Sequence, residues 1–150
     1  MENIGGKMMT LDEFVDQYVA NIRQMYTKTF IDHFDNPRNI GDIIKPDGYA
    51  EDVGECHDSM AIYLEIKDDC IRDARFLTDG CAATIVCGSV VTELAKNKRV
   101  SEAMNITPSD IIQVLEDLPP ENVHCAILAT NTLRKAIKDY YAKRNGQLCT

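Results

Sequence analysis

Residues 59–81, SMAIYLEIKDDCIRDARFLTDGC, predict a β-hairpin that leads directly into a helix. Within residues 61–66, isoleucine and leucine alternate with alanine, tyrosine and glutamate, which is the period of a half-buried strand. Asp68–Asp69 supply the turn, and residues 70–78 form the returning strand. From Ala82 onward, the spacing of apolar residues changes to that of a helix.

An amphipathic helix is predicted over residues 10–26, near the start of the chain. Thr10 and Glu13 have the spacing of a capping box. The apolar stripe of this helix consists of Leu11, Phe14, Val15, Tyr18, Val19, Ile22 and Met25. Such a stripe must pack either onto its own domain or across a homo-oligomer interface, and the sequence leaves both alternatives open.

Further helices are predicted on both sides of the hairpin. A short helical segment ends at Asn36–Pro37, and residues 43–58, which are rich in glycine, proline and aspartate, predict a loop. Thr107–Pro108 begin a helix that stops before a Leu-Pro-Pro sequence. The last helix is expected at about residues 124–144, with Gly146 just past its end.

Together these elements predict an α+β fold, in which helices cover a small antiparallel sheet of about three strands. The N-terminal helix is an extra element. We expect residues 1–25 to form an N-terminal extension, residues 26–145 the main domain and residues 146–150 a flexible tail.

Length and charge exclude several classes of protein. A chain of 150 residues is long enough to bury the core of one domain. The formal charge of −8 argues against nucleic-acid binding, because a basic surface supplies most of that affinity. No apolar run is long enough for a membrane span, and the N-terminus lacks the apolar segment of a secretory signal. We therefore expect a cytoplasmic protein.

The cysteines are the main chemical signal in the sequence. The six stand at positions 56, 70, 81, 87, 125 and 149, and no two of them form a Cys-x-x-Cys motif. In a cytosolic chain, several cysteines indicate metal or thiol chemistry rather than disulfides. Cys56 lies in the predicted loop, whereas Cys81 and Cys125 each lie at the start of a predicted helix. Cys70 and Cys87 suit buried apolar positions, and Cys149 has no evident role.

Two further residues accompany these cysteines. His124 precedes Cys125, and Asp58 lies two positions after Cys56. Three thiolates and an imidazole suit zinc or an iron–sulfur cluster, and a carboxylate is a further ligand. The N-terminus of a helix also lowers the pKa of a thiol, which favours the thiolate. His33, in contrast, is expected to be a structural hydrogen-bonding residue.

Four segments in order resemble the IscU/NifU N-terminal family of iron–sulfur cluster assembly scaffolds. They are YTKTFIDHFDNPRNIG (26–41), GECHDSMAIYLEI (54–66), IRDARFLTDGCAATI (71–85) and LEDLPPENVHCAILATNTLRKAIKDY (115–140). The resemblance covers about residues 26–144 and implies an IscU/SufE-like fold. Such proteins are scaffolds rather than enzymes. They accept sulfur from a cysteine desulfurase, take up iron, receive electrons, and pass a transient [2Fe–2S] cluster to apo-proteins.

The resemblance also implies roles for particular residues. The ligand positions of the family fall on Cys56, Cys81 and Cys125, with His124 as the fourth candidate. Its aspartate falls on Asp58, which keeps the cluster labile and is itself a candidate ligand. Cys125 is implied as the persulfide acceptor. An iron donor and an electron-donating ferredoxin are implied partners, and Zn²⁺ can fill such a site in the isolated protein.

Three features depart from the family pattern. The usual Cys-Gly-Asp is Cys56–His57–Asp58 here, so that an additional candidate ligand replaces glycine. Glu121–Asn122 replace the Val-Lys that follows Leu-Pro-Pro in members served by a dedicated heat-shock chaperone. The loss of the basic residue argues against recognition by that chaperone. The N-terminal helix is longer than is usual in the family.

Three alternative functions remain open. A zinc-dependent, SufU-like sulfur-transfer protein would activate a desulfurase, but such proteins usually have an insertion and a cysteine at the position of His124. A thiol enzyme could use Cys125 and His124, although neighbouring helix residues point about 100° apart, so the base would have to come from another segment, such as His57. A structural zinc domain would unfold when a chelator removes its metal.

Overall fold

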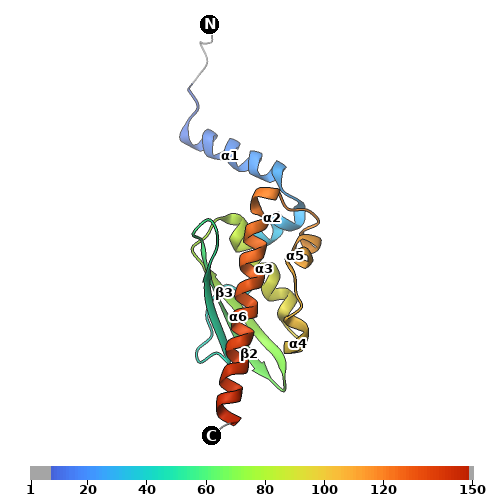
Figure 1. The fold of residues 1–150 in the computed structure, drawn as a ribbon. Coiled ribbons are helices and arrows are strands. Elements are labelled where there is room, and N and C mark those ends of the chain that lie inside the picture. Colours follow the sequence, from blue (N-terminus) through green and yellow to red (C-terminus); the bar gives the residue numbers. More distant parts are fainter. Residues whose placement is uncertain (1–7, 149–150) are drawn as a thin grey trace.

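A three-stranded antiparallel sheet lies at the centre of the computed structural model, which describes residues 8–148 (Figure 1). The strands are β1 (Gly48–Val53), β2 (Ser59–Lys67) and β3 (Cys70–Thr78), and they neighbour one another in chain order. The predicted α+β fold with a small antiparallel sheet is confirmed.

The β2–β3 hairpin forms where the sequence predicts it. Asp68 and Asp69 both have positive φ angles, 55° and 63°, as a two-residue turn between right-twisted strands requires. Alternate residues of β2 are buried, including Ile62, Leu64 and Ile66. The alternation that predicted the strand therefore also marks the face that the helices cover.

Strand β1 corrects the prediction of a loop over residues 43–58. It pairs with β2 from Gly48 opposite Leu64 to Val53 opposite Ser59. Its own composition is poor for a strand, so tertiary packing decides the conformation. A Cβ atom at Gly48 would lie 2.5 Å from the carbonyl oxygen of Ala136, so glycine is needed for the close approach of the last helix.

The helices follow the predicted capping signals. They are α1 (Leu11–Met25), α2 (Lys28–Asp35), α3 (Ala82–Ala95), α4 (Val100–Ala103), α5 (Pro108–Leu115) and α6 (Val123–Leu148), with a short 3₁₀ helix at Pro120–Asn122. The side chains of Thr10, Thr27 and Thr107 cap α1, α2 and α5. The four-residue helix α4 was not predicted.

The end of α6 differs from the prediction. The helix continues past Arg144 to Leu148, so Gly146 lies within it and does not terminate it. A glycine inside a helix lowers the folding stability by only about 1 kcal/mol relative to alanine, so it does not have to end the helix. Of the tail predicted at residues 146–150, the last two residues, including Cys149, lie outside the described part of the chain.

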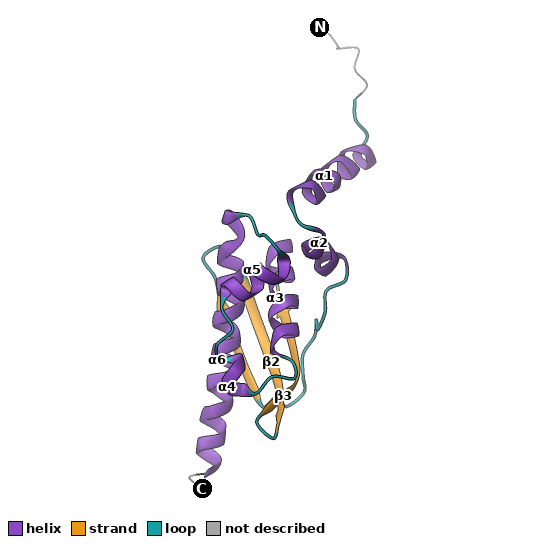
Figure 2. Ribbon diagram, turned by 90° about the vertical axis from the view of Figure 1, so that its right-hand side faces the viewer, coloured by secondary structure: helices purple, strands orange, loops and turns teal. Residues whose placement is uncertain are grey.

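Helices α3 and α6 pack together against the sheet, with α6 along β1 and α3 along β3 (Figure 2). Most of the buried apolar side chains lie between these layers. Cys87 is buried in α3, as predicted. His33 of α2 is also buried, and its Nδ1 lies 2.7 Å from the hydroxyl oxygen of Ser89 in α3. His33 is therefore the structural hydrogen-bonding residue that the sequence suggests.

Helix α1 extends away from this body at the end where α6 begins (Figure 1). Arg23 and Asp35 form a bidentate ion pair that links it to α2. Much of the apolar stripe stays uncovered, because Leu11, Phe14 and Tyr18 remain more than half exposed, although Tyr18 and Val19 border an apolar pocket beside α2. The side chain of Ile22 lies outside the described part. Within residues 8–148, no helix is both long enough and apolar enough to span a membrane.

Candidate metal centre

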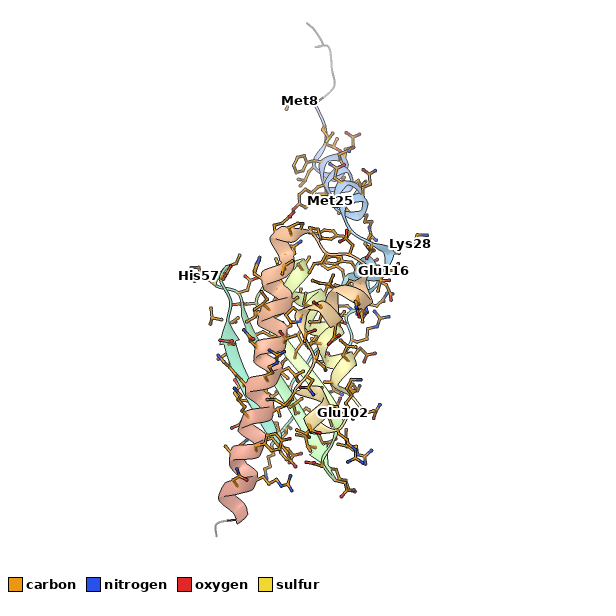
Figure 3. All side chains as sticks on the ribbon, turned by 45° about the vertical axis from the view of Figure 1, so that its right-hand side comes forward. Met8, Met25, Lys28, His57, Glu102 and Glu116 are labelled. Carbon is orange, nitrogen blue, oxygen red and sulfur yellow. The ribbon has the colours of Figure 1, made fainter. Side chains whose placement is uncertain are left out.

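Three segments that are distant in sequence meet at the end of the molecule where α6 begins. They are the loop between β1 and β2, the start of α3 and the start of α6 (Figures 1 and 3). The sheet places the first two side by side, because β3 runs antiparallel to β2 and ends next to its start. Cys81 is the N-cap residue of α3, and Cys125 lies in the first turn of α6.

Asp58, Cys81 and Cys125 form the centre of this site. One ligand atom from each, a carboxylate oxygen and two sulfurs, lies within 4.8 Å of the others. A zinc ion bound at about 2.0–2.3 Å requires ligand atoms only slightly closer together than this. Two sulfurs and one oxygen therefore form a set that small side-chain movements can close around a metal ion.

His124 and Cys56 join the site from its exposed side. His124 Nε2 lies 3.0 Å from Cys56 Sγ and 3.5 Å from Cys125 Sγ. All five residues singled out in the sequence are thus brought together. The expectation that His124 is poorly placed to take the proton of Cys125 is wrong, because the far nitrogen of its ring, Nε2, lies close to Cys125 Sγ.

Sequence reasoning missed Thr84, which lies in the first turn of α3. Its Oγ1 lies 2.7 Å from Asp58 Oδ2, 3.5 Å from Cys81 Sγ and 3.4 Å from Cys125 Sγ. The residue is completely buried. Its position could have been noticed: it is the polar residue three places after an N-cap cysteine that makes no capping hydrogen bond.

Gly80 leaves the space that the Asp58 carboxylate occupies. A Cβ atom at this position would lie 2.8 Å from Asp58 Oδ2 and 2.7 Å from Thr84 Cβ. Any larger residue would therefore push the carboxylate or α3 out of place. The glycine before Cys81 is thus part of the construction of the site.

A family model for the NifU-like N-terminal domain matches residues 25–147. The chain belongs to this family. It is 45% identical over 126 residues to the iron–sulfur cluster assembly scaffold protein IscU 1 of Archaeoglobus fulgidus, covering 83% of this chain and 81% of that relative. It is 41% identical over 130 residues to the IscU scaffold protein of Escherichia coli K12, covering 81% of this chain and 98% of that relative.

Solved structures of NifU-like and SufU proteins have the same fold. A NifU-like N-terminal protein from Brucella abortus superposes with a TM-score of 0.67 at 16% identity, covering 81% of this chain and 98% of that one. A putative SUF-system scaffold protein, FiSufU, from Fervidobacterium islandicum has a TM-score of 0.65 at 22% identity, covering 76% and 97%. At these identities the likeness extends to the fold alone.

His57, the departure from the usual tripeptide of the NifU-like family, does not join the metal centre. Its side chain is exposed, and Figure 3 shows it at the outer tip of the β1–β2 loop. Its φ angle is 66°, in the left-handed region where glycine is favoured over a side chain. The backbone thus keeps a glycine-like conformation although the residue is histidine.

Burial changes the chemistry expected of Cys125. Because Cys125 is desolvated, its thiol pKa rises to about 11, although a hydrogen bond from Thr84 acts in the opposite direction. The expectation that a helix start would favour the thiolate here is therefore wrong, since the loss of water outweighs the helix terminus. A thiol so hidden and so weakly acidic must be uncovered and deprotonated before it can react.

Proposed function

We propose that this protein is a scaffold on which an iron–sulfur cluster is assembled and then passed to apo-proteins. The observation that carries this proposal is the convergence of Cys56, Asp58, Cys81, His124 and Cys125 from three segments. The relatives described above, from Archaeoglobus fulgidus and E. coli, are named as IscU scaffold proteins. The role is that of a carrier, so no catalytic turnover is required of the chain.

The ligand types support a cluster that can leave. A permanent ferredoxin site commonly uses four cysteine thiolates, which bind the cluster tightly. Here the three thiolates are accompanied by an imidazole and a carboxylate, and Cys56 and Cys81 are exposed. We propose a transient [2Fe–2S] cluster on Cys56, Cys81, Cys125 and His124, with Asp58 as the group that keeps it labile. The same ligands can hold Zn²⁺ before the cluster is built.

Sulfur is proposed to arrive on Cys125 from a cysteine desulfurase. The Cys125 thiolate attacks the terminal sulfur of the desulfurase persulfide, a new sulfur–sulfur bond forms on Cys125, and the desulfurase cysteine leaves as a thiolate. His124, 3.5 Å away, can take the proton from Cys125. Cys125 is buried, and His124 links it to Cys56 in the β1–β2 loop, so we propose that the desulfurase displaces this loop before the sulfurs meet.

Conversion of this sulfur to sulfide requires electrons. Each transferred sulfur atom gains two electrons to become sulfide, and each ferrous ion that becomes ferric supplies one. Two sulfurs and two irons therefore leave a deficit of two electrons, which we assign to an electron-donating ferredoxin; an iron donor supplies the metal. We place assembly in the cytoplasm, where thiols remain reduced. Asn122, which stands in place of the lysine that follows Leu-Pro-Pro-Val, argues against a chaperone that reads a basic residue there.

We further propose that α1 pairs with α1 of a second copy of the chain. Leu11, Phe14, Tyr18 and Met25 are each more than half exposed, and a contiguous apolar stripe of this kind is typical of a protein–protein contact. Asp12, Glu13 and Asp16 lie in the first half of α1, whereas Arg23, which also pairs with Asp35, lies near its other end. An antiparallel pair places opposite charges together, which favours self-pairing of this helix.

A Cys125→Ser variant tests the sulfur step. It should accept no persulfide from a cysteine desulfurase, as measured by the mass of the intact protein. Cys70→Ser is the matched control, because Cys70 lies in β3 and is absent from the metal centre. Full persulfide loading of the Cys125→Ser protein would refute the acceptor role.

A further inference from the structure

We propose that Thr84 is a positioning residue that fixes the Asp58 carboxylate for metal binding. Its hydroxyl holds Oδ2 against the start of α3 and so leaves Oδ1 to bind the metal. This inference deepens the proposed function and rests on it only for the identity of the bound species, an iron–sulfur cluster. It concerns the affinity of the site for any suitable metal ion.

The distances indicate where the single hydroxyl proton of Thr84 lies. A threonine hydroxyl donates one hydrogen bond and accepts others. Its contact with Asp58 Oδ2, at 2.7 Å, is much shorter than its contacts with the sulfurs of Cys81 and Cys125, at 3.5 and 3.4 Å. A charged acceptor also gives the stronger bond. The proton therefore lies mainly toward the carboxylate, with the more distant Cys125 sulfur as its weaker acceptor.

The remaining contacts of Asp58 agree with this role. The backbone N–H of Cys81 lies 3.5 Å from the same oxygen, Oδ2. Among the described residues, no hydrogen bond engages the side-chain oxygen Oδ1. One oxygen is thus held by α3 while the other remains available. Gly80, which has no Cβ atom, leaves the space that this oxygen occupies.

Such a hydrogen bond should strengthen metal binding. A ligating carboxylate is commonly oriented by a partner outside the ligand set, and loss of that partner costs about 10–100-fold in metal affinity. Thr84 is fully buried and lies on a helix, so its own position is well defined. A purely structural threonine would instead affect folding stability and leave the affinity of the folded site unchanged.

The test is a double-mutant cycle on zinc affinity. Zn²⁺ binding is measured by competition with a chromophoric chelator for the wild type, Thr84→Val, Asp58→Ala and the double variant. Thr84→Val keeps the shape of the side chain and removes the hydroxyl. We expect it to weaken Zn²⁺ binding about 10-fold in the wild-type background and to have no further effect when Asp58 is already alanine.

Three more variants complete the design. Thr84→Ser restores the hydroxyl and should bind Zn²⁺ like the wild type. Thr84→Ala also removes the hydroxyl, and alanine is favourable in a helix. This variant is measured if Thr84→Val does not fold. Thr130→Val is the matched control, because Thr130 is equally buried but donates only to the carbonyls of Ala126 and Ile127. Its Zn²⁺ affinity should not change.

Two results would overturn the proposal. One is unchanged or tighter Zn²⁺ binding by both Thr84→Val and Thr84→Ala, and the other is an equal loss of affinity with and without Asp58. Because this readout needs no sulfide, it separates the two proposals. A positive cycle in a protein that builds no cluster would leave the role of Thr84 intact and remove only the scaffold function.

Discussion

The imidazole Nε2 of His124 lies 3.0 Å from the sulfur of Cys56, although 68 residues separate them in the sequence. This contact ties the exposed β1–β2 loop to the first turn of α6. The same nitrogen is 3.5 Å from Cys125 Sγ, so a single imidazole connects an exposed thiol with a buried one. Movement of the loop would therefore alter the surroundings of both sulfurs, which suits a site that must open to receive and release its cargo.

Replacement of Asp58 by alanine should slow the departure of the cluster. The carboxylate is proposed to weaken the binding of the cluster to the protein, because it competes with the thiolates for iron or recruits water. Transfer of the cluster to an apo-ferredoxin, followed by circular dichroism, should be slower than in the wild type. Glu51→Ala, an exposed acidic position in β1, is the matched control and should transfer normally. Faster loss to a chelator in Asp58→Ala would contradict this prediction.

The thiols of the metal-free protein should react with iodoacetamide in a fixed order. Cys56 and Cys81 are exposed and should be modified first, whereas Cys87, which is buried and whose thiol pKa is raised by that burial, should be last. For Cys125, with a pKa of about 11, the thiolate is about one part in a thousand at pH 8.

The rate at Cys125 should therefore rise as the pH increases toward 11, because the reactive thiolate replaces the thiol. Peptide mass spectrometry of a time course at several pH values measures this directly. Modification of Cys125 as fast as that of Cys56 at pH 8 would show that the thiol is neither buried nor weakly acidic in solution.

A charge on the apolar stripe of α1 should separate the proposed pair of chains. Phe14 is 60% exposed, and Phe14→Asp would place a carboxylate in the middle of the shared interface. Light scattering after gel filtration should give the mass of two chains for the wild type and of one for this variant. Ala20→Asp adds the same charge on the exposed face opposite the apolar stripe and should leave the pair intact. A wild type that is monomeric at all concentrations would exclude self-pairing and favour a different partner protein.

His57→Gly should stabilise the metal-free protein by about 1 kcal/mol. A left-handed conformation costs a residue with a Cβ atom roughly 1–2 kcal/mol. Glycine avoids this cost but loses part of the gain, because its unfolded state has more conformational entropy. Urea unfolding measures the difference. His57→Ala removes the imidazole but keeps the Cβ atom, so it should not produce the gain. Equal effects of the two variants would assign the change to the imidazole.

Much of the fold is predictable because local and tertiary preferences agree. The Asp68–Asp69 turn, the caps of α1 and α5, and the alternation in β2 each depend on residues close in sequence. β1 could not be predicted in the same way. Its six residues are held by pairing with β2 and by packing against α6, which approaches Gly48 too closely for any side chain.

The metal centre, too, could be predicted from the sequence only in part. The types of residue at positions 56, 58, 81, 124 and 125 indicated a site, but no local pattern states which atoms meet. Thr84 was missed because its hydroxyl acts on Asp58 across 26 residues of sequence. The pKa of Cys125 was misjudged because burial, which depends on the whole fold, outweighs the effect of the helix start.

Iron and acid-labile sulfide content, measured with the visible absorption spectrum, tests the scaffold function most directly. The protein is purified without oxygen and reconstituted with a cysteine desulfurase, ferrous iron and a reductant. We predict equal amounts of iron and sulfide with sulfur-to-iron charge-transfer bands, and transfer of both to an apo-ferredoxin. One tightly held zinc ion per chain, with no sulfide after reconstitution, would contradict the scaffold function and favour SufU-like sulfur transfer.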